Sequence, residues 1–180
     1  MGARDDLLTK VLVEAAANGL TDRSLREIAG AIDSSHRMLH YHFGSRDGLI
    51  AAVVQATEQA EREALRRLAS ESVDAADLMR RLWIDVSSDA QRPFVRLFFE
   101  TVGVRSQVTG SQAWLEAATG LEAPFLTAID PIDLLTAVAT TRGLLVELLA
   151  AGDDADRVAA VHAAHERFVE TWAPRFDGAT

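Results

Sequence analysis

The chain contains no cysteine. That absence excludes disulfide frameworks, thiolate metal sites and cysteine nucleophiles, and it fits a reducing compartment. Aromatic residues make up only 6% of the 180 residues, and proline occurs four times. The apolar fraction is 48% and is rich in leucine, alanine and valine. This composition favours helices over sheets.

No targeting segment is predicted from the sequence. Charges at Arg4, Asp5, Asp6 and Lys10 interrupt any apolar core that a signal peptide would need. No apolar run is expected to approach the ~20 residues that cross a bilayer. We therefore expect a soluble, cytoplasmic protein with no membrane partner. Its length suits one small domain fused to a larger one.

The charge is unevenly distributed. The net charge is −9 for the whole chain. Residues 1–48 carry six basic and seven acidic side chains, a net charge of −1, which leaves −8 for residues 49–180. The acidic excess therefore belongs to the C-terminal part, and the N-terminal part remains open to an anionic partner.

The N-terminal 48 residues contain the signals of three helices. Ser24 with Glu27 forms a capping box at the start of the second helix. Ser35 is a good N-cap for the third helix, and Gly44 ends that helix. Ser45 can cap the helix that follows. The predicted helices cover residues 5–17, 24–32 and 36–43. The short turn between the last two predicts a helix-turn-helix unit.

The stretch from Ser34 to Phe43, SSHRMLHYHF, holds three of the five histidines. At ~100° per residue, Leu39 and Phe43 share one side of the helix and predict its buried face. Arg37, Met38 and Tyr41 point the opposite way, and the histidines occupy the flanks. The fold does not need these polar and aromatic side chains, so the helix displays them.

The segment SLREIAGAIDSSHRMLHYHFGSRDGLIAAVV, with the helix before it, resembles the N-terminal DNA-binding domain of the TetR family of transcriptional regulators. The resemblance covers roughly the first fifty residues. It rests on the helix-turn-helix spacing, on Leu39 to Phe43, and on Ser45 to Leu49 as the start of a fourth helix. Two positions depart from the family pattern. His40 replaces a phosphate-binding tyrosine, and Asp33 replaces a turn glycine, although aspartate tolerates the left-handed conformation.

A recognition helix in the major groove presents its N-terminal half to base edges. Arg37 is the best candidate for base readout, because guanidinium matches the O6 and N7 acceptors of guanine. His36 and Met38 can add a hydrogen bond and a methyl contact. The resemblance implies phosphate or base contacts for the other members of the set, which are Ser24, Arg26, Ser35, His40, Tyr41, His42 and Arg46.

Other interpretations of these residues stay open. They can be solvated polar side chains of an ordinary helical bundle, and His42 can be a partly buried structural residue. His36 and His40 have zinc-ligand spacing, but no clear third and fourth ligand is nearby. His162 and His165 form a second pair, more typical of packing. We predict neither a metal nor a cofactor.

Residues 49–180 are predicted to form further helices, with a break at 71–77, a loop at 105–111 and a helix over 112–129 that is interrupted at Gly120 and Pro124. This gives an all-α chain of about nine helices. The division predicted is a DNA-binding domain over 1–48, with its motif at 24–43, and an effector-binding and dimerisation domain over 49–180. Aromatic side chains gather in the middle helices, where they form an ordinary core or line an apolar cavity. The resemblance implies an effector pocket, for which the candidates are Trp83, Phe94, Phe98, Phe99, Val102, Trp114 and Phe125. Glu100 is one possible orienting group for a small hydrophobic effector.

The last two long helices are the predicted dimer interface, because their apolar stripe is too large for one small core. The residues predicted to form it are Leu134, Val138, Leu145, Leu148, Val161, His165 and Phe168. A two-fold homodimer would place two recognition helices ~34–36 Å apart, or a multiple of that spacing, on a palindrome in double-stranded DNA.

The sequence thus predicts a ligand-responsive, dimeric DNA-binding regulator, most simply a repressor. An enzyme is the first rival, but no carboxylate pair, Ser/His/Asp set, phosphate loop or zinc signature is present. The second rival is a helical small-molecule or protein-binding module that has lost DNA binding. The acidic balance and His40 keep that rival open, because phosphate neutralisation supplies most non-specific affinity.

Overall fold

The computed structural model describes residues 2–20, 22–105 and 130–176, with backbone only for 102–105. Within these ranges the chain forms eight α-helices and one short 3-10 helix, and no strand. The predicted all-α class is therefore confirmed. The segment 106–129, where an interrupted helix was expected, lies outside the described residues. The chain divides into two compact units: residues 1–60 with 93–108 (unit 1), and residues 61–92 with 109–180 (unit 2).

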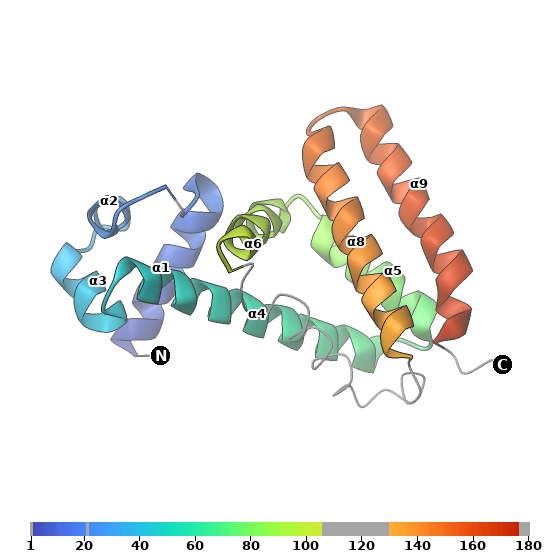
Figure 1. Cartoon of the computed structure of the whole chain (residues 1–180), viewed down its shortest axis with the longest axis horizontal. Coiled ribbons are helices and arrows are strands. Elements are labelled where there is room, and N and C mark those ends of the chain that lie inside the picture. Colours follow the sequence, from blue (N-terminus) through green and yellow to red (C-terminus); the bar gives the residue numbers. More distant parts are fainter. Residues whose placement is uncertain (1, 21, 106–129, 177–180) are drawn as a thin grey trace. The chain divides into compact units, whose positions relative to one another are not determined.

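Unit 1 holds the predicted helix-turn-helix (Figure 1). Its core brings together Val11, Leu20, Leu39 and Val53, none more than 1% exposed, with Leu97 of α6. Short helices need such shared burial, because isolated helices of this length are marginal in water. The elements that contribute are α1 (Ala3–Asn18), α2 (Leu25–Ala31), α3 (His36–Phe43), the first part of α4 (Arg46–Glu71) and most of α6 (Arg92–Arg105).

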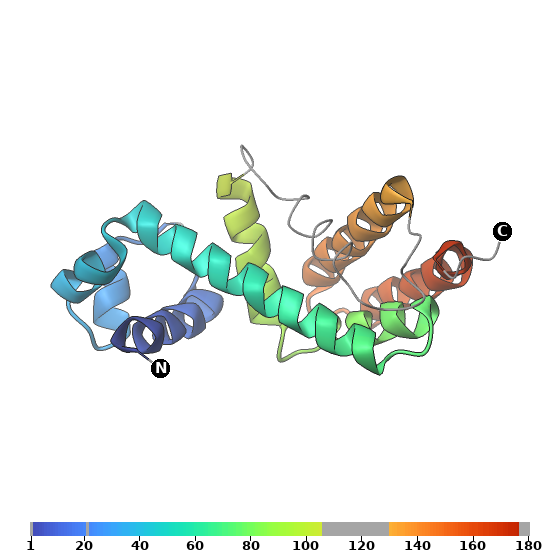
Figure 2. The ribbon, with the colours of Figure 1, turned by 90° about the horizontal axis from the view of Figure 1, so that it is seen from below.

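Unit 2 contains a helical hairpin of α8 (Pro131–Ala151) and α9 (Ala155–Trp172), which lie side by side (Figure 2). Gly152, at φ +58°, ends α8, and the side chain of Asp154 accepts from Arg157 N to begin α9. Helix α5 (Ala75–Ser87) and a 3-10 turn (Ala173–Arg175) pack against α9.

A tryptophan–histidine cluster joins α5 to α9. The ring of Trp83 stacks on His165, with centroids 4.4 Å apart and planes 9° from parallel. Trp83 Nε1 donates to His162 Nδ1 at 2.9 Å. His165 is only 3% exposed, and burial lowers its pKa to about 4. The ring is therefore neutral at physiological pH and acts as a packing residue.

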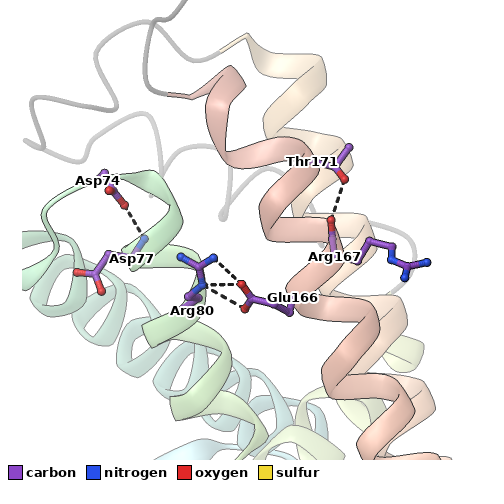
Figure 3. Close-up of polar contacts among 6 residues, drawn as sticks. All are labelled: Asp74, Asp77, Arg80, Glu166, Arg167 and Thr171. Carbon is purple, nitrogen blue, oxygen red and sulfur yellow. Dashed lines mark hydrogen bonds and ion pairs between the residues drawn. The ribbon is translucent and has the colours of Figure 1, made fainter.

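An ion pair lies beside this cluster (Figure 3). Arg80 Nε of α5 donates to both carboxylate oxygens of Glu166 of α9, at 2.9 and 3.1 Å. The bond to Arg80 lowers the pKa of Glu166 and raises that of Arg80. Bidentate geometry makes this pair more specific than an ordinary surface ion pair. It fixes the register between α5 and α9.

Helix α8 is long and apolar enough to cross a membrane by length and composition, with a mean hydropathy of 1.5 in its most apolar window. The expectation that no segment approaches that length is wrong on this measure. One such helix is weak evidence for a membrane, since the core helix of a soluble protein passes the same test. Only 22% of that window is buried. The helix also carries a half-buried Arg142, whose pKa burial lowers.

Candidate nucleic-acid interface

Helix α3 has the two faces predicted for it. Leu39 is 0% exposed and Phe43 is 8% exposed, and both lie in the core of unit 1. Tyr41 is 79% exposed and Met38 is 42% exposed, although both are large and partly apolar. Arg37 is exposed as well. The side chains that suit base contact are therefore exposed to solvent and lie outside the core of unit 1.

Local hydrogen bonds and backbone geometry fix where α3 begins. Ser35 Oγ accepts from Met38 N at 3.1 Å, as its predicted capping role requires. Asp33 adopts φ +51°, so the aspartate does take the left-handed conformation that the turn needs. Both features orient α3 relative to α2, and they leave Ser35 itself exposed near the N-terminal end of the recognition helix.

The junction of α3 and α4 depends on two glycines. Gly44 has φ +74° and ends α3. A Cβ atom at Gly48 would overlap the carbonyl oxygen of Phe43, so only glycine fits there. Ser45 Oγ accepts from Gly48 N at 3.0 Å and caps α4. Periodicity did not reveal the requirement at Gly48, because it arises from the contact of two helix ends.

Arg46 is half-buried, and its Nε donates to the backbone oxygen of Arg23 at 3.0 Å. Arg23 in turn pairs with Glu14 at 2.7 Å. These bonds link α1, the segment before α2 and the start of α4. Nε is one of three guanidinium nitrogens, so Arg46 can hold the loop while its NH1 and NH2 groups contact phosphate. The sequence did not single out Arg23 for this role.

The start of α2 carries the predicted capping box. Ser24 Oγ accepts from Glu27 N at 3.3 Å, and Ser24 N donates to Glu27 Oε2 at 2.7 Å. Bonds from Ser24 lower the pKa of Glu27. The carboxylate thus occupies donors that we expected to face phosphate. Ser24, for which the resemblance implies a phosphate or base contact, is therefore engaged by Glu27 through both its amide and its hydroxyl. Arg26 is exposed and remains available.

The three α3 histidines differ in burial. His36 and His40 are exposed, and their ring centroids lie 6.1 Å apart. His42 is half-buried, with its ring edge-on to Tyr41 at 5.0 Å. Across the described ranges, no group of three or more histidine, aspartate or glutamate side chains is arranged to hold a metal. The histidine pair on α3 thus gains no further ligand from that part of the chain.

The predicted effector residues are distributed over both units. Trp83 is buried in unit 2 and engaged with the two α9 histidines. Phe94, Phe98 and Phe99 lie on the α6 segment assigned to unit 1, where Phe98 and Phe99 contact edge-on at 5.2 Å. Trp114, Phe125 and the side chain of Val102 lie outside the described residues. Phe94 is 37% exposed.

Glu100 has a role that its sequence context did not predict. Its Oε1 accepts from Leu20 N at 2.8 Å, a contact between residues 80 positions apart. It also approaches Gly19, where an added Cβ would lie 3.6 Å from its carboxylate oxygens. The carboxylate joins α6 to the segment after α1. This bond gives Glu100, one of the possible effector-orienting groups, a structural role within unit 1.

Most of the predicted dimer residues are covered within the chain itself. Exposed fractions of 3–9% leave these five side chains little area for a second copy: Leu134, Leu145, Leu148, His165 and Phe168. Val138 and Val161 are half-buried. The large apolar side chains that α8 does expose are Ile132 at 72%, Leu135 at 45% and Val146 at 47%.

Comparison with solved structures identifies the fold as that of TetR-type transcriptional regulators. A candidate transcriptional regulator from Rhodococcus sp. RHA1 matches with a TM-score of 0.71 at 15% identity, over 99% of this chain and 100% of that one. A candidate TetR-family regulator from Rhodococcus sp. matches at 0.68 and 18%, over 94% and 97% of the chains. The fatty acid degradation regulator FadR from Bacillus halodurans matches at 0.64 and 13%, over 94% and 96%. No family model and no curated protein matches the sequence.

Proposed function

We propose that this protein is a sequence-specific, DNA-binding transcriptional regulator that acts as a homodimer in the cytoplasm and responds to a small hydrophobic ligand. The observation that supports it most is the division of α3. Leu39 and Phe43 anchor the helix, while Arg37 and Tyr41 are displayed without a packing role. A helix held in this way by a helix-turn-helix is the element that enters the major groove.

In this proposal Arg37 reads a guanine, Met38 contacts a neighbouring base, and His36 lies between that base and the adjacent phosphate. Phosphate contacts come from the flanks, through His40, Tyr41, His42 and Arg46. Arg46 is suited to this role because its Nε bond to Arg23 O restrains the side chain. Arg26 completes the set from α2, with Ser24 and Ser35 as lesser contributors.

Arg37→Ala is expected to weaken binding to the preferred duplex by about 5- to 150-fold, the equivalent of the ~1–3 kcal/mol of a bidentate base contact. The duplex is obtained by enrichment from a randomised library, and affinity is measured by fluorescence anisotropy. Arg66→Ala is the matched control, because Arg66 is an exposed arginine on the unit 2 part of α4. Equal affinities for the two variants would remove the base-reading role of α3.

Salt dependence separates the regulator from a module that has lost DNA binding. Each phosphate neutralised by the protein adds about 0.9 to the slope of log affinity against log salt. A regulator with the phosphate contacts above should give a steep slope on the enriched duplex. The acidic Glu27 at the start of α2 reduces the contacts available there. A module without DNA binding would enrich no duplex from the library.

The proposed dimer interface lies on a different face of α8 from the one that the sequence predicts. Ile132, Leu135, Ala139, Val146 and Ala150 are all exposed, and at ~100° per residue they fall within one narrow arc of the helix. The adjacent α9 exposes small residues, which are Ala159, Ala160 and Ala163. Small side chains let helices approach closely, and an apolar face of this kind normally meets a partner.

The double variant Leu135→Glu/Val146→Glu is expected to be monomeric at micromolar concentration, because it places four carboxylates in the paired interface of a two-fold dimer. Sedimentation equilibrium measures the molecular mass. Ile84→Glu on α5 is the control, since Ile84 is also a large exposed apolar residue, at 69%. A double variant with the same mass as the parent would show that this face is not the dimer interface.

In this proposal the response to ligand depends on an equilibrium between two arrangements of the helix-turn-helix units of the two subunits. A hydrophobic effector that binds one arrangement more tightly shifts the population by its differential affinity. Repression is the simplest outcome, with the effector releasing the duplex. The aromatic residues of the middle helices are the candidate lining, and its described part comprises Phe94, Phe98 and Phe99 of α6 together with Trp83 of α5, which is engaged by the two α9 histidines.

A further inference from the structure

Histidines outnumber arginines among the basic side chains of α3. Between His36 and His42 the helix holds three histidines and only one arginine. With the histidines neutral, residues 1–48 carry a net charge of −1. DNA affinity depends strongly on cationic groups at phosphates. Histidine is the side chain whose ordinary charge change falls between pH 5 and 8.

His36 and His40 are the two exposed members of this group. They lie one turn apart on the same flank of α3, with ring centroids 6.1 Å apart. No described hydrogen bond or ion pair engages either imidazole. The other titratable side chains of α3 are Tyr41 and His42. The charged groups on α3, on α2, on the turn between them and at the start of α4 are Arg37, Arg26, Glu27, Asp33, Arg46 and Asp47, and Arg4 of α1 lies over the Phe43 ring.

In the proposed complex a phosphate lies near each ring, and a nearby negative charge favours the protonated form of an imidazole. Binding to DNA would therefore take up protons. Linkage requires that a complex which binds more protons than its free components is strengthened as the pH falls.

We propose that His36 and His40 make DNA binding pH-sensitive, so that affinity rises as the pH falls from about 8 to about 6. This inference rests on the proposed function and names a regulation of the same surface. The partner chemistry is the phosphate backbone, and the sensed ligand is the proton.

The expected effect follows from linkage. If phosphate favours the protonated form of each imidazole by about tenfold, affinity rises roughly 6-fold per histidine between pH 8 and pH 6. The pair gives a rise on the order of 30-fold. The salt slope should also be steeper at pH 6, by about 0.9 for each imidazolium at a phosphate.

The test measures affinity for the enriched duplex by fluorescence anisotropy at about pH 6, 7 and 8, each over a range of salt concentrations. Three proteins are compared: the parent, His36→Gln/His40→Gln, and the control His162→Asn. His162 is exposed in unit 2, and asparagine retains an acceptor for Trp83 Nε1. Far-UV circular dichroism at each pH confirms folding. His165, with its pKa of about 4, stays largely neutral throughout.

The parent and the control should show the rise in affinity and the steeper salt slope, and the double variant should show a rise of less than about 3-fold. A parent that binds the duplex with the same affinity at every pH would overturn this inference and leave the proposed function standing. A double variant that keeps the full rise would also overturn it. Failure to enrich any duplex at any pH would overturn both.

Discussion

Leu39→Ala is expected to lower the free energy of unfolding of unit 1 by about 2–5 kcal/mol. Leu39 is 0% exposed and lies in the cluster that joins α1, α2, α3, α4 and α6. Its truncation removes apolar contacts from this shared core and leaves a cavity. Since α3 has only eight residues, Leu39 and Phe43 supply its buried anchoring face. The variant should lose DNA binding together with stability.

Two probes make this measurement specific to unit 1. Residues 1–60 and 93–108 contain no tryptophan, whereas Trp83 and Trp172 belong to unit 2. Urea unfolding followed by circular dichroism should therefore shift to lower urea, by more than the transition followed by tryptophan fluorescence. Met38→Ala, on the exposed side of the same helix, should change stability by less than about 0.5 kcal/mol. Equal midpoints for Leu39→Ala and Met38→Ala would contradict the buried anchor.

Acid is expected to destabilise unit 2 by an amount set largely by His165. Burial against Trp83 lowers the pKa of His165 to about 4, from an ordinary value of 6.5. Between these values the unfolded chain binds more protons than the native one, so stability falls as the pH falls. The loss is about 1.4 kcal/mol per pH unit and on the order of 3 kcal/mol in total. Above pH 6.5 the contribution is fully present.

The measurement is urea unfolding by tryptophan fluorescence at about pH 6.5 and pH 5. Few carboxylates titrate in that interval, so the change of roughly 2 kcal/mol reports mainly on histidine. His165→Phe keeps an aromatic ring against Trp83 and removes the titration, so its stability should change much less. The variant His162→Asn should retain most of the dependence. A parent protein equally stable at both pH values would contradict this account of the cluster.

Local signals in the sequence were sufficient to predict the helix-turn-helix segment. The capping pair of Ser24 and Glu27 and the cap at Ser35 act over three residues, so a short pattern reveals them. Leu39 and Phe43 are spaced by one helical turn, and helical geometry alone predicts that they share a face. Asp33 took the left-handed conformation because its short polar side chain tolerates it.

Contacts between distant segments could not be predicted in this way. The bond from Leu20 N to Glu100 joins residues 80 positions apart, and the bond from Trp83 to His162 joins residues 79 apart. Periodicity describes which side of a helix is apolar and does not say what covers it. This is also why the apolar residues of α8 were assigned to a partner. Leu134, Leu145 and Leu148 are covered within the chain, while Leu135 and Val146 are exposed.

The claim that α3 reads bases in DNA is tested most directly by one binding titration of the enriched duplex. Arg37→Ala and Arg66→Ala are compared with the parent on the duplex enriched from a randomised library. The account predicts a palindromic duplex that the parent and Arg66→Ala bind alike, and that Arg37→Ala binds at least about 5-fold more weakly. Three indistinguishable binding curves, or a library from which no sequence is enriched, would contradict it.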